Sequence, residues 1–325
     1  MAGRASAAEF PALEAYAHSA TEEAMLDAMP GCRFVFARLL LLALALSAGI
    51  AAPLARGQSA EVMLTPAAVE SGSPVLIHVE ASGDAVISGD WLGRKLEFIA
   101  ARGGSGWYAL AGADVETPAG PSTLRLVVHT GSGVRDLSRT VLIHAAHYRT
   151  GSLSVAPKFV EPGPEELKLI EADSQVKARV FASSAAHPLW VGSFHAPVGS
   201  APTDSFGTRR MFNGKLASIH KGMDFRAPTG TPVRAGNGGT VVLARKLYYE
   251  GNCVIVDHGL GLWTISMHLS RIDVREGQSV AQGERLGLSG ATGRVTGPHL
   301  HWAVRWQGAY LDPAKLLRLN LAALR

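Results

Sequence analysis

The sequence predicts an all-β protein in which a small antiparallel β-sandwich is followed by a compact, glycine-rich all-β domain. Three observations support this fold class. Short β-rich runs alternate with Gly, Pro, Asp and Ser turns, and helix-length periodicity is absent from the second half of the chain. The 325 residues give room for two domains, and 47% hydrophobic with 18% charged residues is typical of a globular protein.

The first 60 residues predict export rather than a folded domain. Met29, Arg33 and Arg38 precede the apolar run at 39–52, and small residues follow up to residue 60, which predicts a secretory signal peptide over residues 29–60. A short membrane anchor is the alternative, although such a short run spans a bilayer poorly. Residues 1–28 carry one Arg against five Asp or Glu and fit neither a signal nor a core, so we expect translation to start at Met29.

Residues 61–147 predict the sandwich, because runs such as SPVLIHVEA, STLRLVVH and RTVLIHA are strand-like and separated by turn residues. We expect structural roles for the histidines scattered along these strands, namely His78, His129, His144 and His147. Residues 148–193 form a linker with a Pro-Gly-Pro turn and then a predicted short helix. Its apolar residues recur at helical spacing at Leu167, Ile170, Val176 and Val180.

Residues 194–318 predict the second β domain, and residues 319–325 a C-terminal tail. The runs GTVVLARK, NCVIVDHG and LWTISMHL follow one another as strands, and glycines separate the short apolar segments after them. Such a domain has a small core. A cluster of histidines within it is therefore hard to explain by packing alone.

The charge and the cysteines limit the classes of function. Residues 1–60 hold four Lys or Arg and five Asp or Glu, so the rest of the chain keeps 27 positive and 22 negative residues, a net charge of +5. No basic run with interleaved aromatic residues is present, so nucleic acid is not an expected partner, whereas an anionic cell envelope is. Cys32 and Cys253 can build neither a disulfide framework nor a thiolate zinc site. A metal site in this chain must use His, Asp or Glu.

Five residues of the second domain form a candidate site: His220, Asp224, His268, His299 and His301. His220 and Asp224 stand four apart in HKGMDF, which puts both on one side of an extended strand. From His299 onward the sequence alternates like a half-buried strand, so His299 and His301 share a side. His268 ends the run LWTISMHL. Each motif alone is explained more simply by a surface or hydrogen-bonded histidine, whereas three motifs in one small domain point to a metal site.

In order and spacing, these motifs resemble the lysostaphin/LytM-type zinc metallopeptidases, which cut peptidoglycan cross-bridges. The resemblance covers about residues 194–318, where SFGTRR and GTPVRAGNGGTV are also similar to the family. It implies that His220, Asp224 and His301 bind Zn²⁺, while His268 and His299 act on the substrate. Two neutral imidazoles and one carboxylate would leave the metal with a net positive charge and an open coordination position, as a catalytic site requires. The sandwich resembles, more weakly, the Ig-like modules that precede this domain in Gram-negative envelope proteins.

The resemblance implies a zinc metalloendopeptidase that hydrolyses peptide cross-links of peptidoglycan, in the periplasm of a Gram-negative bacterium. With the signal cleaved, no stable membrane span is expected. The alternative is a non-enzymatic protein of the same fold that activates a cell-wall amidase, although such members have lost zinc ligands that this chain keeps. A peptidoglycan-binding or structural envelope protein is a third class, and it predicts no dependence on zinc.

Four further residues bear on the site. We expect His258, in VDHG, to be structural or to support the site from outside the ligand set. Arg209 and Arg210 fit substrate binding and an ordinary surface role equally well. Ser266 stands where the family commonly has an aromatic residue, two positions before the strand-end histidine, so the groove beside His268 is expected to differ.

Overall fold

The computed structural model describes residues 62–101, 106–153, 159, 161–212 and 215–321. The predicted early start (1–28) and signal peptide (29–60) lie outside these residues. Within the described part, strands predominate and two helices form, so the all-β prediction is confirmed. No helix of that part is both long enough and apolar enough to cross a membrane.

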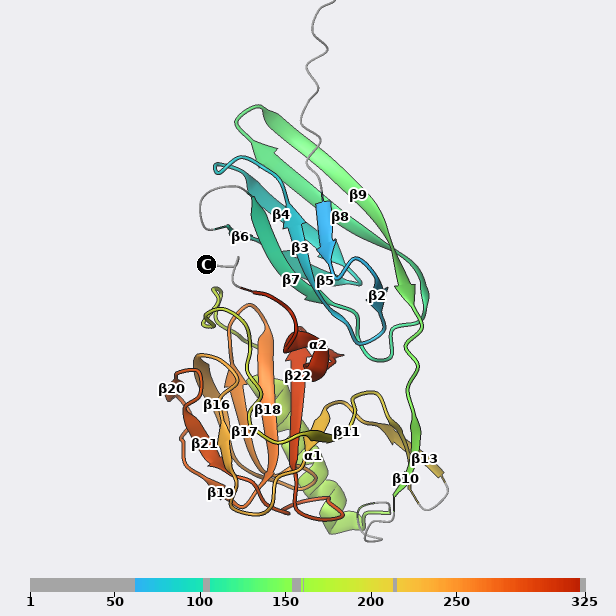
Figure 1. Ribbon diagram of the computed structural model, residues 1–325, viewed down its shortest axis with the longest axis vertical. Coiled ribbons are helices and arrows are strands. Elements are labelled where there is room, and N and C mark those ends of the chain that lie inside the picture. Colours follow the sequence, from blue (N-terminus) through green and yellow to red (C-terminus); the bar gives the residue numbers. More distant parts are fainter. Residues whose placement is uncertain (1–61, 102–105, 154–158, 160, 213–214, 322–325) are drawn as a thin grey trace, which may run out of the picture. The chain divides into compact units, whose positions relative to one another are not determined.

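Two sheets make up the N-terminal β region (Figure 1). The first has the order β1 (Val62–Thr65), β3 (Pro74–Val79), β7 (Trp107–Gly112) and β6 (Ile99–Ala100). The second has the order β2 (Val69–Glu70), β9 (Gly133–His144), β8 (Gly120–Thr130), β4 (Val86–Trp91) and β5 (Arg94–Glu97). The Ig-like assignment of this region stays a prediction, as do the domain boundaries.

Alternation along β8 shows why this region folds as a sheet with one buried face. Leu124, Leu126 and Val128 are buried, whereas Arg125 between them is exposed, as expected of a strand packed on one side. One pair departs from the antiparallel prediction, because β2 lies parallel to β9. Strands so far apart in the sequence are not joined by a hairpin, so no turn forces them to be antiparallel.

The histidines of this region lie outside the candidate site. His78 stacks on Tyr108 with ring centroids 4.4 Å apart. The other three, on β8, on β9 and just after β9, are exposed: His129, His144 and His147. The group of residues that could hold a metal contains none of these four.

The linker contains the predicted helix and also a strand that the sequence did not indicate. Helix α1 (Pro164–Val180) begins with Pro164 and two glutamates and ends near Lys177 and Arg179, charges that suit the helix dipole. Val176 and Val180 pack on the apolar cluster formed by the large C-terminal sheet. Strand β10 (Thr150–Leu153) precedes the helix and pairs in parallel with β12 (Arg209–Phe212).

The C-terminal region is built on one large sheet (Figure 1). Its order is β11 (Pro202–Asp204), β14 (Met223–Phe225), β22 (Leu300–Trp306), β18 (Leu262–Leu269), β17 (Gly251–Asp257), β16 (Gly239–Leu247) and β20 (Ser279–Val280), with β23 (Ala309–Leu311) beside β22. Two small sheets accompany it. One joins β10, β12 and β13 (Lys215–Ile219), and the other joins β15 (Pro232–Arg234), β21 (Arg285–Leu288) and β19 (Arg271–Ile272). Helix α2 (Pro313–Leu316) follows the sheet and is capped by Asp312, whose carboxylate accepts from Ala314 N.

Strand β22 lies between β14 and β18 and is more deeply buried than its alternating sequence predicts. Trp302 and Trp306 are buried on one face, and His301 and Ala303 are buried on the other. The half-buried prediction is therefore wrong. The second face is covered because Ala303 belongs to the apolar cluster on which α1 packs, while His301 faces other polar residues.

Candidate metal centre and groove

Three side chains, which we call the triad, bring nitrogen and oxygen atoms that can bind a metal within hydrogen-bond distance of one another. His220 Nε2 lies 3.0 Å from Asp224 Oδ1 and 2.9 Å from His301 Nδ1, and His301 Nδ1 lies 2.8 Å from the same carboxylate oxygen. All three residues are buried. Imidazole nitrogens and carboxylate oxygens gathered this closely need a proton or a cation between them, and the set can hold a metal ion.

Strand pairing places two of these residues. Asp224 on β14 stands directly opposite His301 on β22 in the antiparallel register, and cross-strand neighbours have side chains in contact. His220 reaches the pair differently, which corrects the prediction that His220 and Asp224 share one extended strand. Strand β13 ends at Ile219, the chain bends at Gly222, and β14 begins only at Met223.

Neighbouring groups fix the orientation of the triad. His220 Nδ1 lies 3.0 Å from the carbonyl oxygen of Ser205, which can only accept, so Nδ1 carries the proton and Nε2 offers its lone pair to the cluster. Arg210 Nη2 donates to Asp224 Oδ2 at 2.7 Å and to Asp204 Oδ2 at 2.9 Å. Arg210 therefore holds the carboxylate so that its other oxygen faces the two imidazoles.

His268 and His299 stand beside the triad. The ring centroid of His268 is 5.0 Å from that of His299 and 6.0 Å from that of His301. His268 Nδ1 lies 2.9 Å from the carbonyl oxygen of Thr292, and His299 Nδ1 lies 2.8 Å from that of Gly297. Both Nδ1 atoms are therefore donors, and each Nε2 keeps a lone pair.

Burial disfavours the charged form of two of the site histidines, His268 and His301. Burial lowers the pKa of His301 to about 4, against the opposing hydrogen bond with Asp224. The pKa of His268 is lowered to about 3, mainly by burial and in smaller part by the neighbouring His301 and His299. For Asp224, burial alone would raise the pKa, but hydrogen bonding to His220 and His301 holds the pKa well below its ordinary value. Neutral imidazoles beside an ionised carboxylate are the protonation states that metal binding requires.

The sequence comparison agrees with this geometry: residues 218–313 match the model of Peptidase family M23. The chain carries an M23 peptidase domain. The resemblance to lysostaphin/LytM-type peptidases is thereby confirmed for this part of the chain.

Curated relatives match about a third of the chain. The peptidoglycan DD-endopeptidase ShyA of Vibrio cholerae is 42% identical over 120 residues, which are 37% of this chain and 27% of that protein. The DD-carboxypeptidase/endopeptidase Mpg of Neisseria meningitidis is 41% identical over 98 residues, 30% of this chain and 23% of that protein. The matched part of this chain thus spans about a quarter of the length of these relatives.

A crystal structure from Pseudomonas aeruginosa assigned to peptidase M23 resembles more of the chain. It has 29% sequence identity and a TM-score of 0.59, and the match covers 76% of this chain and 94% of that one. The similarity therefore extends beyond the M23 domain into the preceding part of the chain.

His258 has a structural role, one of the two roles expected for it. It is fully buried, with Nδ1 2.7 Å from the carbonyl oxygen of Gly238 and Nε2 2.8 Å from Thr264 Oγ1. Burial lowers its pKa to about 4. Ser266, where an aromatic residue is common in the family, is also buried and lies opposite Trp302 on β22.

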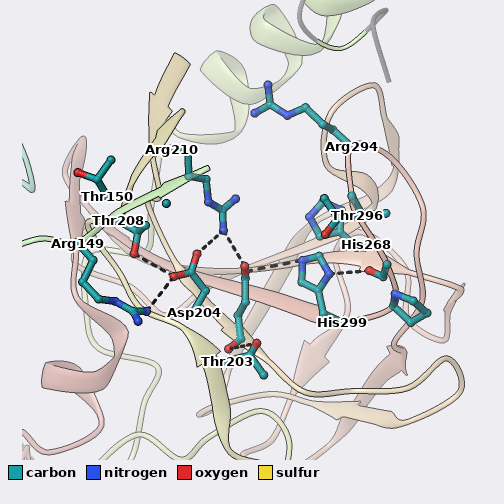
Figure 2. A pocket seen from close by; sticks show the side chains of 15 residues that line it. Arg149, Thr150, Thr203, Asp204, Thr208, Arg210, His268, Arg294, Thr296 and His299 are labelled. Carbon is teal, nitrogen blue, oxygen red and sulfur yellow. Dashed lines mark hydrogen bonds and ion pairs between the residues drawn. The ribbon is translucent and has the colours of Figure 1, made fainter. Parts of the chain in front are cut away.

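The triad opens into a groove of about 470 Å³ (Figure 2). Asp224, His268 and His299 border it together with polar residues of several segments, among them Arg149, Thr150, Asp204, Arg210 and Arg294. A second hollow of similar volume borders His220, His268 and His301. The candidate metal centre thus lies beside an open groove.

The sequence does not indicate several residues of this groove. Asp204, Arg149 and Arg294 stand in no recognisable motif. The sequence fits substrate contact and a surface role equally well for Arg210, whereas the structure shows that Arg210 binds Asp224 directly. Arg209 beside it is exposed. Alternation along β12, which separates the two arginines onto opposite sides, was the one available signal.

Proposed function

We propose that the protein is a zinc-dependent endopeptidase that hydrolyses peptide cross-links of bacterial peptidoglycan. The observation that carries the proposal is the set of three buried donors, His220, Asp224 and His301, at the edge of an open groove. Three protein ligands leave a coordination position for water or substrate, which separates catalytic zinc sites from closed structural ones.

The donor set suits zinc in particular. Two imidazoles and one carboxylate are ligands that zinc takes in metallopeptidases. Arg210 on Asp224 and Ser205 on His220 supply the outer hydrogen bonds that metal ligands commonly need. When bound here, zinc would supply Lewis acidity, polarising the peptide carbonyl and lowering the pKa of a coordinated water to about 7.

The proton transfers fall to His268 and His299. Each has Nδ1 bonded to a carbonyl oxygen and Nε2 available, so each can accept a proton at Nε2 and then donate it. In the protonated form either imidazole stabilises negative charge that develops on the substrate oxygen. Together they can take the proton of the attacking water and deliver one to the leaving amine.

The relatives support the substrate class and the compartment. Proteins named peptidoglycan DD-endopeptidase in Vibrio cholerae share the M23 domain at up to 42% identity, and peptidoglycan lies outside the cytoplasmic membrane. We therefore place the protein in the periplasm of a Gram-negative bacterium, in line with the predicted signal peptide at 29–60.

The test is digestion of purified cross-linked peptidoglycan by the protein, with the products separated by mass. Dimeric muropeptides should become monomers while the sugar backbone stays intact, and a chelator should stop the conversion until zinc is restored. The Asp224→Ala variant serves as the inactive control. A zinc-loaded protein that cuts no wall type, yet raises the rate of a wall amidase, would establish the activator alternative instead.

A further inference from the structure

One wall of the groove comes from residues 149–151, which precede the segment matched by the M23 family. Strand β10 pairs in parallel with β12, so that Thr150 stands beside Arg209 and Gly151 beside Arg210. The Arg209 N–H also donates to the Arg149 carbonyl at 2.8 Å. Main-chain bonds therefore attach this wall to the strand whose Arg210 holds Asp224.

The Arg149 side chain makes only long contacts with its neighbours in the groove. Its Nη2 lies 3.4 Å from Asp204 Oδ1 and 3.4 Å from Ser205 Oγ, and 69% of the side chain is exposed. Asp204 already accepts shorter bonds of 2.9 Å from Thr208 and from Arg210. A long, exposed ion pair contributes little, so the Arg149 guanidinium keeps donors for a ligand in the groove.

The charges around the groove favour an anionic ligand. Three arginines and two aspartates line it: Arg149, Arg210, Arg294, Asp204 and Asp224. Arg210 is bonded to both aspartates, and the proposed metal would add two further positive charges. A cleft with this excess of positive charge attracts and orients negatively charged peptides.

Figure 2 shows where Arg149 lies in the pocket. Arg149 and Thr150 stand on the side of the pocket away from His268 and His299. A guanidinium binds a carboxylate through two parallel hydrogen bonds, which fixes both position and orientation.

We infer that Arg149 binds a free carboxylate of the substrate peptide, on the side of the scissile bond away from His268 and His299. The inference rests on the proposed endopeptidase function and names its substrate class: cross-links that carry a free, unmodified carboxylate beside the bond that is cut. The strand before the M23 domain is then part of the substrate site.

The test compares two dimeric muropeptides that differ only at this carboxylate, free in one and amidated in the other, with the full-length zinc-loaded protein. The wild type should prefer the free acid by about 10- to 100-fold in kcat/KM, the range of a charged hydrogen-bond pair. Arg149→Gln should lower that ratio to near one, chiefly through KM. Arg275→Gln, an exposed arginine outside the groove lining, should keep the wild-type ratio.

A second variant tests the wall without changing its charge. A Cβ at Gly151 would lie 3.5 Å from Thr208 Cγ2, an ordinary contact, so Gly151→Leu should fold and narrow the groove. We expect at least a tenfold loss in kcat/KM with zinc content and melting temperature unchanged.

Equal cleavage of both muropeptides by the wild type, or an unchanged preference in Arg149→Gln, would overturn the inference and leave the proposed function standing. Unchanged turnover in Gly151→Leu would show that the wall does not face the substrate. If the wild type cuts neither muropeptide, the proposed function fails. The inference is then decided by titrating each muropeptide into the zinc-loaded protein, where the free acid should bind more tightly than the amidated form.

Discussion

Gly222 lies where the triad leaves no space for a side chain, so Gly222→Ala should disturb the metal centre without removing a ligand. A Cβ built at this position is 2.4 Å from His301 Nε2 and 2.8 Å from the main-chain oxygen of Trp302. Ordinary contact begins at 3.4 Å, so the imidazole must move by about 1 Å. Moving the main-chain oxygen on β22 costs more energy than moving a side chain, so we expect the His301 ring to be displaced.

This displacement should lower both the stability of the protein and its affinity for zinc. Overpacking a buried position lowers the free energy of unfolding by about 1 to 3 kcal/mol, and displacing the support of a ligand weakens metal binding by about 10- to 100-fold. Zinc affinity is measured by competition with a chromogenic chelator, and stability by denaturant unfolding of the metal-free protein. Gly199→Ala is the matched control, because a Cβ there meets nothing within 4 Å. Zinc affinity within twofold of the wild type in Gly222→Ala would refute the argument that close approach fixes the ring.

Three further predictions concern the histidines and Arg210. His299→Ala and His268→Ala should keep zinc but lose two or more powers of ten in turnover, and loss of zinc in His299→Ala would exchange its assigned role with that of His301. Arg210→Met should weaken zinc binding by about 10- to 100-fold, because Asp224 loses its 2.7 Å donor; unchanged affinity by chelator competition would show that Arg210 does not orient the ligand. His258 has a pKa of about 4 in the folded protein, against an ordinary 6.5. Its contribution to the free energy of unfolding is therefore complete above pH 6.5, and about 3 kcal/mol of it is lost as the pH falls from 6.5 towards 4. Denaturant unfolding between pH 7 and 4 should show a weaker pH dependence for His258→Gln than for the wild type, and identical slopes would count against this pKa.

The sequence predicted the members of the cluster because their signals are local. Even spacing in HLH and the order of three histidine motifs are visible in one dimension, and alternating strands predict an all-β fold without knowledge of pairing. The assignment of His220, Asp224 and His301 as ligands stays a prediction until a metal is measured. The structure adds that their donor atoms lie 2.8 to 3.0 Å apart.

What the sequence could not predict depends on register and on long-range pairing. Asp224 faces His301 because β14 pairs with β22 across more than seventy residues, and nothing local specifies that register. Arg149 reaches the groove through the parallel pairing of β10 with β12, which again joins distant segments. The bend at Gly222 replaced the expected continuous strand because His301 must approach the backbone there.

Anomalous diffraction at the zinc absorption edge, from crystals of protein purified without added metal, tests the central claim most directly. We expect one strong peak about 2.0 to 2.2 Å from His220 Nε2, His301 Nδ1 and Asp224 Oδ1, with His268 and His299 beyond coordination distance. A peak coordinated by His268 or His299 in place of these ligands, or no peak at the triad in crystals soaked with zinc, would contradict it.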